Sequence, residues 1–378
     1  MSGGRTMSAT RFFAPDSLED ALRLLAEYRG GAVVVNGGTD IVEKIAFDRI
    51  RPEAVVYIGN IRSLCDVERR AGYTVIGGGV VYADILRSPL CAPLDALRDA
   101  IAEIGSPPIR AVATLAGNIG SAVPAADGNV ALVALGALVE LVSLEGERSV
   151  PVCDVFLGPG RTCLKPYELI RGIVIPDRGH PSAFVKLARR KSQDIAQVSA
   201  AVRLDMDGDV CRDVVIGMGA VAATVVRAKS FEILLRGLPI EEGLAQLRGA
   251  VPTEASLRSP RNRAYKEAVM GVIVERAVRK ALGRRSSCLY HLYHQWERTE
   301  SRRGGDGAAG GYLAPAPWLD RDEESLWDGG LRGLHCHRGW RGRAFLHSSH
   351  GFNARKEHYH HRGAGRRQPP APDPAGLH

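Results

Sequence analysis

The sequence predicts an α+β fold with two domains and an irregular tail. Helix and strand patterns alternate over residues 8–178, whereas strand patterns followed by two helices fill residues 182–283. The composition changes at residue 284, because all four tryptophans and ten of the eleven histidines lie beyond residue 281. A chain of 378 residues, 45% of them apolar, is long enough for two or three domains with sizeable cores.

The first domain opens on a predicted helix. Leu18, Leu22 and Leu25 recur at helical spacing. Ser17 is placed to cap this helix, and Asp20 adds an acidic side chain to its first turn. The other elements expected in this domain are strands at 32–35, 54–58 and 73–76, an amphipathic helix at 94–104 and a strand that ends at 173–176.

The second domain is expected to begin after a boundary near residues 177–181, where Gly and Pro flank His180. Its strand patterns predict an antiparallel sheet, and two helices follow. The strands are expected at 184–186, 198–204 and 214–220, and the helices at 231–235 and 265–281.

Charge and composition exclude several classes of protein. The net charge of +8 includes 15 basic and 10 acidic residues from position 284 onward, so the first 283 residues carry only +3 and do not indicate nucleic-acid binding. No apolar run is long enough to span a membrane, and residues 1–17 lack the apolar segment of a secretory signal. Widely spaced cysteines are typical of reduced thiols, which predicts a cytoplasmic protein.

Two glycine-containing loops, at 36–40 and 114–121, are the first candidates for chemistry. Glycine permits unusual backbone angles, so that successive N–H groups can converge on a phosphate. Side chains of Thr39, Asn118 and Ser121 are available as further donors. Neither loop matches a dinucleotide fingerprint or a Walker A loop, and each taken alone also fits a tight turn.

Two other features have both a structural and a functional interpretation. Asp127 precedes a predicted helix, where it fits either an N-cap or an acceptor for ribityl or ribose hydroxyls. Lys186 begins a basic run that ends at Asp194; the two would share one face of a regular strand, although such runs are usually solvated. His180 is the one histidine of the two domains, and no spaced His/Cys cluster predicts a metal site, so redox chemistry would require a cofactor.

Several motifs, in the same order along residues 8–283, resemble the FAD-binding subunits of the molybdenum hydroxylases, the family of xanthine dehydrogenase and carbon monoxide dehydrogenase. The loops at 34–41 and 114–119 resemble the two FAD loops of that family. The segments 36–40 and 194–196 are most similar to those of bacterial xanthine dehydrogenases. The other matching segments are 124–127, 156–160, 164–170, 190–196 and 219–228.

The resemblance implies a two-lobed FAD-binding domain of the vanillyl-alcohol-oxidase type at 8–178 and a flavoprotein C-terminal domain at 182–283. It places Asp127 at ribityl or adenosine hydroxyls, Ile170 on the adenine side and Lys186 beside the flavin. The implied FAD-binding residues are Val34, Val35, Asn36, Gly37, Gly38, Thr39, Asp40, Ile41, Thr114, Leu115, Ala116, Gly117, Asn118, Asp127, Ile170 and Lys186. The sequence departs from the family pattern at Asn36, Ala116, Ala223 and Val225.

The role implied by the resemblance is electron relay, with no catalytic residue on this chain. A molybdopterin-binding large subunit would hydroxylate a purine or other heteroaromatic substrate, and a [2Fe–2S] small subunit would pass electrons to FAD and then to NAD+. Oxygen is an alternative acceptor. A stand-alone FAD oxidoreductase of the same fold is an alternative function, and a basic scaffold protein is another, suggested only by the tail.

The tail at 284–378 has three interpretations: a disordered basic segment, a metal site around the histidines that flank Cys336, and an out-of-frame translation. The last fits best. Read one nucleotide later, suitable codons for Leu326, Leu331, Leu334 and Leu346 encode cysteines. These have the C-x4-C-x2-C spacing of plant-type [2Fe–2S] proteins, followed by a later cysteine. The tail then represents the iron–sulfur sequence of the same enzyme family.

Overall fold

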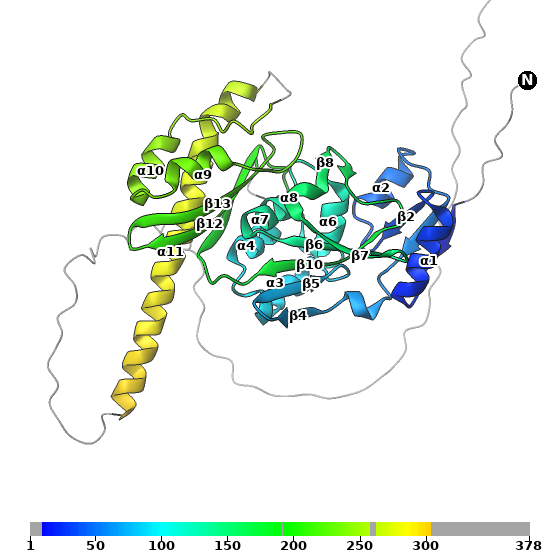
Figure 1. Cartoon of the computed structure of the whole chain (residues 1–378), viewed down its shortest axis with the longest axis horizontal. Coiled ribbons are helices and arrows are strands. Elements are labelled where there is room, and N and C mark those ends of the chain that lie inside the picture. The colour runs from blue at the N-terminus through cyan, green and yellow to red at the C-terminus, as the bar shows by residue number, and fades with distance from the viewer. Residues whose placement is uncertain (1–9, 191, 258–261, 304–378) are drawn as a thin grey trace, which may run out of the picture. The chain divides into compact units, whose positions relative to one another are not determined.

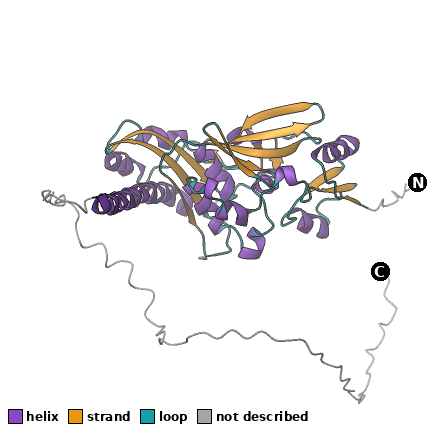
Figure 2. Ribbon diagram, turned by 90° about the horizontal axis from the view of Figure 1, so that it is seen from below, coloured by secondary structure: helices purple, strands orange, loops and turns teal. Residues whose placement is uncertain are grey.

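The computed structural model describes residues 10–190, 192–257 and 262–303. Three sheets of three or more strands and one two-stranded hairpin, with helices packed between and around them, make up this part of the chain (Figures 1 and 2), which confirms the α+β class. The predicted tail from residue 304 lies outside the described residues. No helix among those described is long and apolar enough to cross a membrane.

The first lobe of the N-terminal domain is built on a parallel three-stranded sheet in the order β1-β3-β2. Helix α1 packs its Leu22 and Leu25 against this sheet in a small core of its own. As predicted, Ser17 caps α1, because its side chain accepts a hydrogen bond from the Asp20 N–H. The elements of this lobe are β1 (Arg11–Phe13), α1 (Leu18–Tyr28), β2 (Ala32–Val35), α2 (Ile41–Ala46), β3 (Ala54–Tyr57) and the 3-10 turn η1 (Arg62–Leu64).

The second lobe is an antiparallel five-stranded sheet in the order β4-β5-β10-β6-β7, covered on one face by helices. Its core includes nearly every residue of the apolar helix α7, which is why that segment has no amphipathic pattern. The elements are β4 (Val67–Arg70), β5 (Tyr73–Gly77), α3 (Tyr82–Arg87), η2 (Pro89–Cys91), α4 (Asp95–Glu103), α5 (Pro107–Arg110), α6 (Leu115–Ser121), α7 (Asp127–Leu135), β6 (Leu138–Ser143), β7 (Gly146–Pro151), α8 (Val152–Val155), the hairpin of β8 (Phe156–Gly158) and β9 (Arg161–Thr162), and β10 (Leu169–Pro176).

The C-terminal domain is an antiparallel sheet in the order β11-β12-β13-β14. Alternate residues of β12 face opposite layers: Ala200 and Val202 pack in the core with α9 and α11, whereas Ala201 joins the core around α7. The two domains therefore share an apolar interface. The elements are β11 (Ser182–Leu187), β12 (Val198–Asp207), β13 (Val210–Gly219), β14 (Val226–Arg227), α9 (Lys229–Leu235), α10 (Ile240–Leu247) and α11 (Arg263–Arg303).

Two differences from the predicted elements concern helices. Helix α10 was not predicted, and α11 continues to Arg303 although residues 284–303 were expected to belong to the irregular tail. Residues 284–303 contain neither glycine nor proline, so nothing in this stretch stops a helix that has already started. The composition change at residue 284 therefore does not coincide with the end of regular structure.

Candidate functional site

A cavity of about 380 Å³ opens between the two lobes of the N-terminal domain. The end of β2 and its following loop form one wall, α6 forms another, and Leu169 and Ile170 of β10 close the cavity. Thirteen of the sixteen predicted FAD-binding residues line it, namely Val34, Val35, Asn36, Gly37, Gly38, Thr39, Asp40, Ile41, Thr114, Ala116, Gly117, Asn118 and Ile170. The fold thus brings the two predicted loops together around one space.

The loop after β2 is held against the segment before α6 by a close backbone approach. A Cβ atom on Gly37 would lie 1.9 Å from the Val112 carbonyl oxygen, so only glycine fits without moving the backbone. Gly38 has a φ of +69°, in the left-handed region that glycine favours. On the other side, the Asn36 Nδ2 donates to the Gly79 carbonyl over 3.1 Å. The glycines of this loop are therefore explained by packing and backbone shape.

Asp40 joins the two loops electrostatically. Its Oδ2 accepts a hydrogen bond from the Ser121 hydroxyl and one from the Lys44 ammonium, each over 2.6 Å. Burial acts to raise the pKa of Asp40, but these two hydrogen bonds outweigh it and hold the pKa below the usual value. The Asp40 carboxylate is thus a bridge between α2 and α6.

Donor groups are available along the same loop. Among the hydrogen bonds of the described residues, none uses the backbone N–H groups of Gly37, Gly38, Thr39 or Asp40. Lys44 also lines the cavity nearby, where its ammonium group is paired with the Asp40 carboxylate. Consecutive free N–H groups in a turn form a concave anion-binding surface.

Helix α6 uses its predicted residues in different ways. Thr114 is its N-cap, and the Thr114 hydroxyl accepts from the Gly117 N–H over 3.0 Å. Leu115 does not reach the cavity, because its side chain is buried in the core around α7. Gly120 lines the cavity with open space beside it: a Cβ atom there would have no neighbouring atom within 4 Å.

Asp127 and Lys186 lie outside the cavity lining and pair with each other across the domain interface. The Lys186 Nζ is 2.8 Å from the Asp127 Oδ2 and 3.1 Å from the Glu103 carbonyl oxygen, and both charged side chains are only 6% exposed. Burial raises the pKa of Asp127 to about 6; Lys186 opposes this rise, and the charge of Glu103 adds to it. The N-cap interpretation of Asp127 is wrong, because Ala126 is the cap and the Asp127 side chain is turned to Lys186.

The expectation that Lys186 and Asp194 share one face of a strand is also wrong. Strand β11 ends at Leu187, and Asp194 lies in the loop that follows. There its carboxylate accepts hydrogen bonds from the N–H groups of Arg190 and Ile195 over 2.9 and 3.0 Å. The prediction required an extended chain from Lys186 to Asp194, but the chain around Asp194 forms a turn in which the carboxylate binds backbone N–H groups.

Several residues of the cavity wall were not predicted from the sequence. Apolar residues cannot be told from core residues by pattern, whereas Lys44, four positions after Asp40, had a helical i,i+4 signal. The missed lining residues are Val33, Lys44, Ile58, Gly78, Tyr82, Ile104, Ile109, Ala113, Gly120, Leu164, Glu168 and Leu169. The described residues contain no cluster of His, Cys, Asp and Glu that could hold a metal ion.

Both domains match known protein families. Residues 7–178 match the family profile described as the FAD binding domain in molybdopterin dehydrogenase, and residues 183–281 match the CO dehydrogenase flavoprotein C-terminal domain. The nicotinate dehydrogenase FAD-subunit of Eubacterium barkeri is 32% identical over 62% of this chain and 82% of its own length. The chain belongs to the FAD-binding subunits of the molybdenum hydroxylases. It is accordingly a subunit of an FAD-dependent oxidoreductase.

For other relatives, the match with this molybdenum hydroxylase subunit covers almost the whole length of the relative. The carbon monoxide dehydrogenase medium chain of Afipia carboxidovorans is 30% identical over 72% of this chain and 96% of its own length. The crystal structure of quinoline 2-oxidoreductase from Pseudomonas putida 86 superposes with a TM-score of 0.68 at 27% identity, covering 72% of this chain and 96% of that one.

Proposed function

We propose that this subunit binds FAD in the cavity between its lobes and relays electrons from a [2Fe–2S] partner to NAD+, while a molybdopterin-binding partner hydroxylates a purine or other heteroaromatic compound. The observation that carries the proposal is the meeting of both predicted FAD loops around one cavity. Bound FAD would supply the conversion between one-electron and two-electron transfer that such a relay needs.

The groups around the cavity fit the parts of FAD. The free N–H groups of Gly37 to Asp40, together with Lys44, suit a pyrophosphate, which only accepts hydrogen bonds. Ile58, Ile104 and Ile109 offer apolar walls for flat rings. Buried oxygen atoms without partners, such as the Asn118 Oδ1, suit the hydroxyl groups of the ligand.

Filling the cavity tests the binding site. Gly120→Phe places a large side chain into the open space of the cavity without meeting the backbone, so we expect it to reduce bound FAD at least tenfold while the fold is kept. Gly283→Phe is the matched control, because Gly283 is also a helical glycine with open space beside it but lies outside the cavity. The measurement is flavin absorbance per protein after equilibration with FAD. Equal flavin content in both variants would contradict the proposed site.

The partners and substrate are proposed from the relatives. One relative is named an FAD-subunit and another a medium chain, which indicates that each works within a complex. Nicotinate and quinoline are nitrogen heteroaromatics, which supports a substrate of that class. Anaerobic addition of NADH to the FAD-loaded protein tests the acceptor: bleaching of the flavin supports NAD+, and an unchanged spectrum argues for another acceptor.

The tail supports the iron–sulfur partner independently. We propose that residues 284–378 are an out-of-frame translation of an adjoining or fused [2Fe–2S] sequence, because one shift of frame, with codons that end in TG at four leucines, would create four cysteines in order. The chain as written then lacks these four cluster ligands, so an intact iron–sulfur partner must provide them. The nucleotide sequence decides this: codons other than those ending in TG at Leu326, Leu331, Leu334 and Leu346 would rule it out.

A further inference from the structure

Tyr82 has a buried hydroxyl group with nothing in the described protein to bind. The residue is 2% exposed and lines the cavity, and its hydroxyl oxygen has no hydrogen-bond partner among the described residues. A buried hydroxyl without a partner costs about 1–3 kcal/mol of stability, so its presence beside a cavity calls for an explanation. No sequence motif identified this residue.

The position of Tyr82 is set by the FAD loops themselves. Its N–H donates to the Ala113 carbonyl over 2.9 Å, and the preceding Val81 pairs with Thr114 in a β-bridge. Tyr82 also begins α3, so its backbone is fixed on both sides. The backbone of Tyr82 is therefore held at the cavity wall by the same segment that leads into α6.

A second unpartnered atom lies near the same glycine as the Tyr82 hydroxyl. The Asn118 Oδ1 is buried without a partner, and Asn118 also lines the cavity. Both atoms flank Gly128, because a Cβ atom there would lie 2.9 Å from the Asn118 Oδ1 and 3.6 Å from the Tyr82 hydroxyl oxygen. The phenol can donate a hydrogen bond and the amide oxygen can only accept one. A ligand hydroxyl group, which does both, complements this pair.

The charge state of the phenol suits such a donor. Burial, and to a lesser extent the charge of Asp127, raise the pKa of Tyr82 well above its usual value. The hydroxyl thus keeps its proton throughout the physiological range. A phosphate would leave the Asn118 oxygen unsatisfied, since a phosphate diester carries no proton to donate.

We propose that Tyr82 is a ligand-binding residue whose hydroxyl donates to a hydroxyl group of the FAD polyol, ribityl or ribose, while the Asn118 Oδ1 accepts from that same group. This inference rests on the proposed function. It orients the ligand, with its pyrophosphate at the loop of Gly37 to Asp40 and its polyol at Tyr82.

The test is Tyr82→Phe, with Tyr28→Phe as the matched control. The Tyr28 hydroxyl is also buried without a partner, but Tyr28 lies outside the cavity lining. We expect Tyr82→Phe to weaken FAD binding roughly tenfold, the worth of one hydrogen bond to a ligand, and Tyr28→Phe to leave it unchanged. Without FAD, neither variant should be less stable to urea than the parent protein, because each loses only an unpartnered hydroxyl.

Each outcome is decisive. If the parent protein binds FAD and Tyr82→Phe binds it equally well, the role of Tyr82 is overturned and the proposed function stands. If the parent protein does not bind FAD, the proposed function fails first. A ligand-free Tyr82→Phe that is markedly less stable would also overturn the inference, because the hydroxyl would then have a protein partner. Competition by ADP-ribose shows which polyol the Tyr82 hydroxyl contacts. If ADP-ribose competes with FAD less effectively on Tyr82→Phe than on the parent protein, the contact is with the ribose. If it competes equally well on both, the contact is with the ribityl chain.

Discussion

Asp127 is the residue at which electrostatics and burial oppose each other most clearly. Its carboxylate is paired with Lys186, which would ordinarily lower the pKa, yet burial raises the pKa to about 6. The folded protein therefore binds this proton more tightly than the unfolded chain does. The resulting stabilisation is present below the ordinary pKa near 3.8 and is lost as the pH rises through about 6.

The loss of this stabilisation with rising pH leads to a prediction for Asp127→Asn, which removes the titrating group and nearly keeps the shape of the side chain. The free energy of unfolding of the parent protein, relative to that of the variant, should fall by about 1 kcal/mol between about pH 5 and about pH 7.5. Urea unfolding at both pH values measures it. A relative stability that rises with pH would show that Lys186 outweighs burial and would contradict the assignment.

The glycines show which residue roles a sequence reveals. The sequence marks Gly37 and Gly38 as part of a loop, but two different causes require them: the Val112 carbonyl beside Gly37 and the positive φ of Gly38. Gly120 belongs to the second loop yet has neither constraint in the structure. A glycine in a motif is visible from the sequence, whereas the contact that requires it is not.

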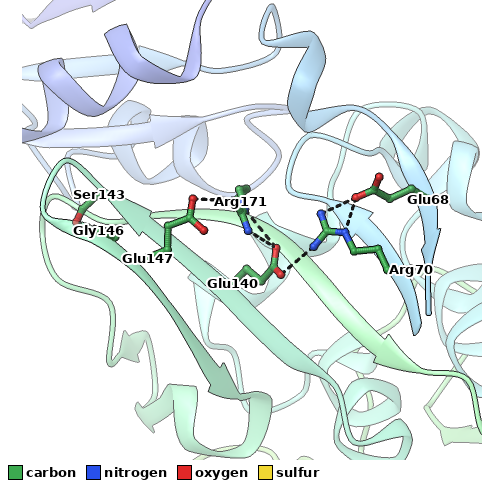
Figure 3. Close-up of polar contacts among 7 residues, drawn as sticks. All are labelled: Glu68, Arg70, Glu140, Ser143, Gly146, Glu147 and Arg171. Atoms are coloured by element: carbon green, nitrogen blue, oxygen red, sulfur yellow. Dashed lines mark hydrogen bonds and ion pairs between the residues drawn. The ribbon is translucent and has the colours of Figure 1, made fainter. Parts of the chain in front are cut away.

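At the scale of elements, ion pairs cross four strands of the five-stranded sheet on one face (Figure 3). Glu140 of β6 lies at the centre and accepts from Arg70 of β4 and Arg171 of β10, each over 3.1 Å. Glu68 pairs with Arg70 at one end of this chain of charges, and Glu147 pairs with Arg171 over 2.6 Å at the other. The Glu140 side chain is 15% exposed, compared with 55% for Glu147.

The difference in exposure between Glu140 and Glu147 predicts that their substitution lowers the free energy of unfolding by different amounts. Glu140→Gln leaves two guanidinium groups short of a carboxylate in a partly buried position and should lower the free energy of unfolding by about 2 kcal/mol. Glu147→Gln removes an exposed pair and should cost less than about 0.5 kcal/mol. Urea midpoints of both variants provide the comparison. Equal urea midpoints for the two variants would mean that Glu140, at the centre of the ion pairs, contributes no more stability than the exposed Glu147.

Elements with a strong local signal were predicted well. The capped helix α1 and strand β2 have the expected starts, because their signals lie within a few residues: Ser17 with Asp20, and an apolar run that ends at a glycine loop. The strand position of Asp194 and the end of α11 were predicted wrongly. A hydrogen bond within a turn replaced the strand at Asp194, and no helix stop follows residue 283 in α11.

At the scale of the whole molecule, α7 connects the two domains. A Cβ atom on Gly217 of β13 would lie 2.4 Å from the Val130 carbonyl oxygen of α7, so the helix and the sheet touch backbone to backbone there. The Lys280 Nζ crosses the same interface to the Asp99 carboxylate over 3.0 Å. The C-terminal domain is thus docked on the FAD-binding domain by close packing and by buried or half-buried charges.

The close approach predicts a large effect from one methyl group. Gly217→Ala should force the helix and the sheet apart and lower the free energy of unfolding by about 1–3 kcal/mol. Gly158→Ala is the matched control, since a Cβ atom at Gly158 meets nothing within 4 Å. Thermal or urea unfolding of the two variants measures the difference. If Gly217→Ala is as stable as the control, the interface between α7 and β13 accommodates the methyl group and the prediction is wrong.

The sequence by itself determined the family and the order of the domains and singled out the two glycine-containing loops of the candidate site, because these depend on residues close together in the chain. Only the tertiary structure decided that the loops enclose one cavity, that Leu115 faces away from it, and that Asp127 pairs with Lys186. It also placed Tyr82 and the isoleucines on the wall. The physical reason is that a cavity wall assembles from segments distant in sequence, and its apolar and orphaned polar groups follow the same local patterns as an ordinary core.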